Sequence, residues 1–104
     1  MAGERMRLIE WRPVRHGKLR GFASVWLPIG LRINDCPVLD GPEGVWAALP
    51  GRPELDRDGR ARVGANGERV YQPVLEWRSR RLREAFSARL ISLVREAYPH
   101  DFDR

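Results

Sequence analysis

Arginines gather near the start of the last strongly patterned segment of this 104-residue chain. From residue 77 to residue 97 there are six arginines and two glutamates, a local excess of four positive charges. The densest group is Arg78, Arg80, Arg81 and Arg83. Guanidinium groups present forked pairs of N–H donors that match phosphate oxygens. We therefore predict a phosphate-binding surface here. The alternative is a solvated face whose arginines pair with nearby acidic residues.

The segment that carries these arginines has the periodicity of an amphipathic helix. Its apolar residues recur at intervals of three and four: Leu82, Ala85, Phe86, Leu90, Leu93, Val94 and Ala97. We predict a helix over about residues 77–97, ended by Pro99, with a frayed tail over residues 100–104. Arginines at the start of such a helix lie beside the positive end of its dipole, where a bound anion would neutralise them.

Alternating apolar and polar residues before this helix predict a series of strands. The expected strands cover residues 6–13, 19–27, 31–39 and 45–49. The first is expected to end at Pro13. Because proline has no N–H for a ladder, Pro37 predicts either an edge position or a bulge in the third strand. Strands followed by one helix indicate an α+β fold with an antiparallel sheet of four or five strands and one long C-terminal amphipathic helix.

A polar, glycine-containing stretch separates the strands from the helix. We predict a mobile loop or loose hairpin over residues 51–69, followed by an extended piece at 70–75 that returns the chain to the sheet. The chain as a whole, residues 1–104, has the length of a single domain. Arg52, Arg60 and Arg62 in the loop would add to the phosphate-binding surface.

Three aromatic residues lie out of phase with the small residues that suit the face beneath the helix. They are Phe22, Trp26 and Trp46. One helix cannot cover both faces of a sheet, so these side chains predict a homodimer interface on the uncovered face. Two alternatives are a platform on which unpaired bases stack and a place in the internal core.

Charge and composition limit the classes of partner. The chain has 19 basic and 14 acidic residues, a net charge of +5, which suits a polyanion such as DNA or RNA. No apolar run is long enough for a membrane helix, and no export signal is visible, so we expect a cytoplasmic protein without a membrane partner. Cys36, His16 and His100 form no catalytic or metal-binding pattern, so we expect no enzyme activity, metal, cofactor or small-molecule substrate. Cys36 is expected to be a small buried residue.

The stretch from Gly17 to Pro50 resembles the stage V sporulation protein G (SpoVG, septation protein) family. The matching residues are Gly17-Lys18-Leu19-Arg20, Phe22-Ala23-Ser24-Val25-Trp26-Leu27, Asp35, Val38-Leu39-Asp40-Gly41 and Gly44-Val45-Trp46-Ala47-Ala48-Leu49-Pro50. Further matches are Asp58-Gly59, Pro73-Val74 and the basic residue Arg81. The resemblance implies a curved antiparallel sheet with a C-terminal helix, dimerisation through strands, and regulatory binding of DNA and often RNA. It also implies that Arg80 and Arg81 contact the nucleic acid.

Together these observations predict a dimeric nucleic-acid-binding regulator that contacts DNA and possibly RNA. The alternative is a protein-interaction module that uses the apolar sheet face without nucleic acid.

Overall fold

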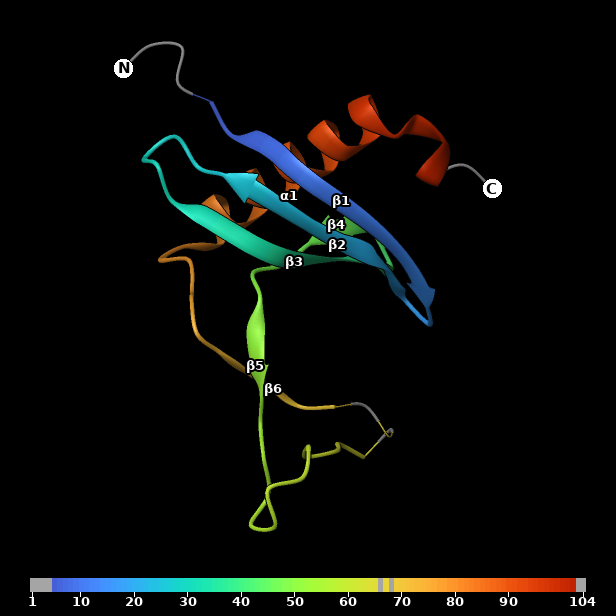
Figure 1. The fold of residues 1–104 in the computed structure, drawn as a ribbon, viewed down its shortest axis with the longest axis vertical. Helices are drawn as coiled ribbons and strands as arrows, with labels where there is room; N and C mark the ends of the chain where they lie inside the picture. The colour runs from blue at the N-terminus through green and yellow to red at the C-terminus, as the bar shows by residue number, and fades with distance from the viewer. Residues whose placement is uncertain (1–4, 66, 68, 103–104) are drawn as a thin grey trace.

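A computed structural model describes residues 5–65, 67 and 69–102 of the chain. It is an α+β fold in which a four-stranded antiparallel sheet is followed by a C-terminal helix, as predicted. The sheet has the order β1-β2-β3-β4 and consists of β1 (Arg7–His16), β2 (Leu19–Trp26), β3 (Arg32–Gly41) and β4 (Gly44–Ala47). The remaining elements are β5 (Gly51–Pro53), β6 (Tyr71–Pro73), the helix α1 (Arg80–Ala97) and the 3-10 helix η1 (Pro99–Phe102). The helix covers one face of the sheet, and β5 and β6 extend away from it (Figure 1).

The first strand is longer than predicted. It continues through Pro13 to His16, and the chain then turns at Gly17, whose φ is +62°. Pro13 does not end the strand, because β1 lies at the edge of the sheet. An edge strand pairs on one side only, so it tolerates a residue that lacks a backbone N–H. The prediction that the strand stops at Pro13 was wrong for this reason.

The third strand contains a bulge, but at Asn34 and Asp35 and not at Pro37, which pairs in regular register with Phe22. Ala23 pairs with Cys36 and Val25 with Ile33, so the single residue Ser24 lies opposite two residues of β3. One of these two is Asp35, which has a positive φ of 56° and donates its backbone N–H to the Ser24 hydroxyl at 3.1 Å. The bulge lets the strand keep its apolar side chains on the face that the helix covers.

The core lies between this face and α1. The sheet contributes buried residues such as Trp11, Ala23, Val25, Cys36 and Val38, and the helix contributes Phe86, Leu90, Ile91 and Val94. The predicted apolar stripe is only partly confirmed, because Leu82 is 42% exposed and Ile91, which the stripe left out, is buried. The helix turns Ile91 toward the sheet and leaves its first turn beyond the edge of the core.

The helix begins three residues later than the predicted start at about residue 77, because Ser79 caps it. Ser79 has extended backbone angles, and its hydroxyl accepts a hydrogen bond from the N–H of Leu82 at 3.2 Å. Trp77, which we expected to open the helix, instead packs against Phe86 with 5.1 Å between the ring centroids. Trp77 therefore anchors the approach to the helix and takes no part in its hydrogen bonding.

The described residues of 51–73 form a hairpin arm. β5 and β6 pair only with each other, and isolated bridges join Leu55 to Ala61 and Val63 to Arg69. The prediction of a hairpin in this region is confirmed, whereas its mobility stays a prediction; residues 66 and 68 lie outside the described residues. The prediction that residues 70–75 return to the main sheet was wrong, because Tyr71–Pro73 pairs with β5.

The end of the chain is packed against the sheet, contrary to the prediction of a frayed tail. The η1 turn brings Phe102 to the Trp11 ring, with 5.9 Å between the centroids. Asp101 Oδ2 accepts a hydrogen bond from Trp11 Nε1 at 2.6 Å. These contacts exist because the helix ends next to β1; residues 103 and 104 lie outside the described residues.

Candidate nucleic-acid interface

The arginines at the start of α1 lie on an exposed helical turn that contains no acidic residue. Arg80, Arg81 and Arg83 lie in the first turn, which contains no acidic residue. All three side chains are exposed, as is the preceding Arg78. The positive end of the helix dipole adds to the field of these cations, so an anion is the natural counter-charge.

Only one of the four arginines pairs with a carboxylate in the described part of the chain. Arg80 Nε lies 2.9 Å from Glu84 Oε1, one helical turn away. The two side chains are 80% and 62% exposed, and such a surface pair contributes about 0.3–0.5 kcal/mol. Within residues 5–65, 67 and 69–102, no carboxylate pairs with Arg78, Arg81 or Arg83. Three guanidinium groups thus remain available, and a phosphate can compete for the fourth.

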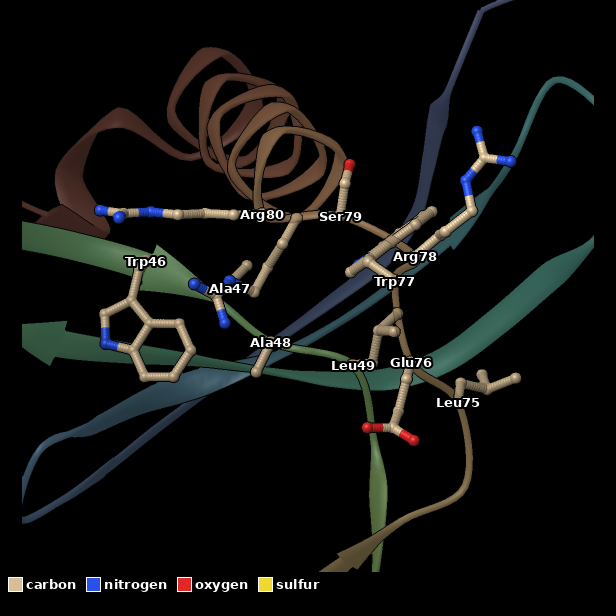
Figure 2. A pocket seen from close by; sticks show the side chains of 11 residues that line it. Trp46, Ala47, Ala48, Leu49, Leu75, Glu76, Trp77, Arg78, Ser79 and Arg80 are labelled. Carbon is tan, nitrogen blue, oxygen red and sulfur yellow. The ribbon is translucent and has the colours of Figure 1, made fainter.

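A cavity of about 340 Å³ lies between the end of β4 and the approach to the helix (Figure 2). Its lining comes from two parts of the chain. The end of β4 and the residues after it contribute Trp46, Ala47, Ala48 and Leu49, and the approach to the helix with its first turn contributes Leu75, Glu76, Trp77, Arg78, Ser79, Arg80 and Arg83. Figure 2 shows the Arg80 side chain toward the same side as Trp46, whereas Arg78 extends to the opposite side. The structure therefore divides the predicted arginine cluster.

The members of the cluster have different surroundings. Arg80 and Arg83 line the cavity on the side of β4. Arg81 is exposed and is not among the described residues that line the 340 Å³ cavity. Arg52, the other predicted contact, is exposed on β5 in the hairpin arm and is not brought to the cavity. A nucleic acid that contacts Arg52 and the helix arginines together would have to span the arm and the body of the protein.

The three predicted interface aromatics lie on the face that α1 leaves uncovered. Phe22 and Trp26 alternate with Ala23 and Val25, which are fully buried under the helix. Trp46 pairs with Leu39, while their neighbours Ala47 and Val38 belong to the core. Trp26 is 42% exposed, Trp46 is 43% exposed and Phe22 is half-buried. Their part in a dimer stays a prediction.

Sequence patterns missed the arginines on this uncovered face. Arg12 lies beside Phe22 with its guanidinium carbon 5.2 Å from the ring centroid, and it is 3.4 Å from an Asp35 carboxylate oxygen. Arg32 lies 6.0 Å from the centroid of the Trp26 ring. Cation–π pairs of this kind arise from the strand register, because Arg12 is opposite Phe22 and Arg32 is opposite Trp26. The sequence patterns could not predict these cation–π pairs, because they do not give the register between neighbouring strands.

The Cys36 thiol does not have the surroundings of a reactive group. Its side chain is fully buried between sheet and helix, as expected for a small core residue. Burial, together with the charge of Asp35, raises the pKa of Cys36 to about 12, so the thiol is protonated at neutral pH.

The described residues contain no group of three or more His, Cys, Asp and Glu side chains that could hold a metal ion. No helix among them is long and apolar enough to cross a membrane.

No protein-family model matches the chain, and no curated protein is significantly similar to it. The resemblance to the SpoVG family therefore rests on the matching residues alone and stays a prediction.

Proposed function

We propose that this protein is a dimeric, non-enzymatic nucleic-acid-binding regulator of the cytoplasm that holds phosphates with the arginines at the start of α1. The observation that carries the proposal is the lack of carboxylate partners for Arg78, Arg81 and Arg83 within the described residues, next to a helix turn without acidic residues. DNA and RNA both supply phosphates at short, regular spacing, and the net charge of +5 favours either polymer.

The uncovered sheet face supports a dimer. It presents Trp26, which is 42% exposed, on the same strand as the half-buried Phe22. Exposed aromatic side chains are costly in water, and a second copy of the chain would cover them. Two copies would also double the number of arginines that one nucleic acid can contact.

Salt dependence of binding tests the electrostatic mechanism. If each subunit neutralises about three or four phosphates, a dimer makes about 6–8 contacts and its affinity falls roughly 10³- to 10⁴-fold between 50 and 200 mM salt. Fluorescence anisotropy with labelled DNA and RNA oligonucleotides measures this slope. Binding that barely responds to salt would contradict the proposal.

A charge-matched pair of variants locates the site. Replacing Arg81 and Arg83 by alanine should lower affinity at least tenfold and reduce the salt slope by about four contacts, two from each subunit of the dimer. Replacing Lys18 and Arg5, which are exposed and lie outside both the loop and the helix start, removes the same charge and should have a much smaller effect. Equal losses in the two double variants would mean that net charge, and not the helix start, governs binding.

A second candidate function uses the same apolar face for a different protein. The exposed Trp26 is the observation that favours it. Light scattering separates the two: a homodimer in isolation supports the first proposal, whereas a monomer that binds no oligonucleotide supports an interaction module.

A further inference from the structure

Trp46 is an exposed aromatic residue that borders hollows on the surface. It lies on the edge strand β4 and contributes to the 340 Å³ cavity and to a neighbouring hollow of about 240 Å³. Its indole is held against β3: a Cβ at Gly41 would lie 2.9 Å from Trp46 Cδ1, so only a glycine leaves room for the ring there. One side of the ring packs against Gly41, while 43% of the residue stays exposed to solvent.

The larger cavity combines apolar and cationic groups. Ala48 and Leu49 form part of its wall, and Arg80 and Arg83 lie where the helix begins. Among the described residues that line it, Glu76 is the only acidic one, and Figure 2 shows that its carboxylate extends away from Arg80. A volume of about 340 Å³ is within the range of sites that accept small molecules.

These features match the parts of one nucleotide. A base offers a flat π-face that stacks on an indole, and its phosphate suits a guanidinium group. Bases inside a duplex are already stacked and paired, so they cannot enter without being flipped out. An unpaired base meets no such cost. The hollow beyond Trp46 shares Ala47 and Arg83 with the cavity, so a strand has room to continue along β4.

We infer that the cavity between β4 and the start of α1 binds an unpaired nucleobase of a single-stranded nucleic acid, stacked on Trp46, with the adjoining phosphate held by Arg80 and Arg83. This inference rests on the proposed nucleic-acid function and narrows its ligand to strands with unpaired bases. It assigns Trp46 to the binding site and leaves Phe22 and Trp26 to the dimer surface.

The test compares one oligonucleotide as a single strand and as a blunt duplex, with affinities measured by fluorescence anisotropy. Trp46→Ala should weaken single-strand binding about 5- to 100-fold, the range found for loss of a stacked base, and change duplex binding less than twofold. Trp46→Phe should retain most of the single-strand affinity. Tyr98→Ala, which removes an equally exposed aromatic residue at the other end of the helix, should change neither affinity.

A spectroscopic measurement covers the case in which Trp46→Ala fails to fold. In protein labelled with 5-fluorotryptophan, the ¹⁹F resonance of Trp46, assigned by its loss in Trp46→Phe, should shift with the single strand and not with the duplex. An unmoved resonance in a saturated single-strand complex would overturn the inference.

The outcomes separate this inference from the proposed function. If no oligonucleotide binds, the proposed function fails and the base site fails with it. If binding is salt-dependent but Trp46→Ala affects single strand and duplex equally or not at all, only the base site is wrong. If Trp46→Ala abolishes self-association, the cavity is occupied by a second copy, and the inference is also overturned.

Discussion

The indole N–H of Trp11 donates a 2.6 Å hydrogen bond to Asp101 Oδ2, which joins the first strand to the end of the chain across 90 positions. Phe102 stacks on the same indole, and Arg20 Nη1 donates to the Asp101 carbonyl at 3.3 Å. The C-terminal turn is therefore part of the wall around the edge of the core, next to β1.

Asp101→Ala should destabilise the fold. A hydrogen bond to a charged group contributes about 1.5–3 kcal/mol, and partial exposure places the expected loss near the lower end. A loss of about 1–2 kcal/mol would lower the melting temperature by roughly 4–15 °C in a domain of this size. Thermal unfolding followed by circular dichroism measures it. Asp58→Ala, at an exposed turn, is the control and should lie within about 0.5 kcal/mol of the parent.

Substitution of the helix cap should separate stability from binding. Ser79→Asp keeps an oxygen acceptor for the N–H of Leu82 and adds a negative charge at the positive end of the dipole, so stability should be unchanged or slightly raised. The same charge lies beside Arg80 and Arg81 and repels phosphate, so affinity for nucleic acid should fall about tenfold. Ser79→Asn is the neutral control, with the cap retained and affinity unchanged. Full affinity in Ser79→Asp would remove the helix start from the binding surface.

The buried thiol predicts a specific dependence on pH. The pKa of Cys36 is raised from 9.0 to about 12 in the folded protein, so the folded state holds its proton more tightly than the unfolded state. The stabilisation is complete below pH 9 and is lost as the pH rises from about 9 toward 12. The free energy of unfolding of the wild type should therefore fall more steeply over this range than that of Cys36→Ala. Parallel curves for the two proteins would contradict the prediction.

The uncovered sheet face can be tested by its own substitution. Trp26→Glu places a charge in the proposed dimer surface and should convert a dimer into a monomer, as measured by sedimentation equilibrium. Ile29→Glu, in the turn after β2 and 86% exposed, is the control and should stay dimeric. A wild type that is monomeric at high concentration would exclude the homodimer altogether.

Local periodicity was enough to establish the fold class. Alternating residues identify the strands because side chains of a strand point to opposite faces, and the spacing of Phe86, Leu90 and Val94 identifies the helix. The order of residues likewise located the arginine cluster, and it showed that Phe22, Trp26 and Trp46 alternate with the small residues of the core face. These features depend on neighbouring residues, so the amino-acid sequence determines them without knowledge of distant contacts.

Tertiary structure alone decided what lies beside what. It brought Trp46 next to Arg80 and Arg83, separated Arg52 from them, and packed Asp101 and Phe102 on Trp11. It also paired Tyr71–Pro73 with β5, outside the main sheet. These relationships depend on strand register and on how the helix crosses the sheet, which arise from packing between segments far apart in the chain. Periodicity reports which face a residue occupies and carries no information about its partner across that face.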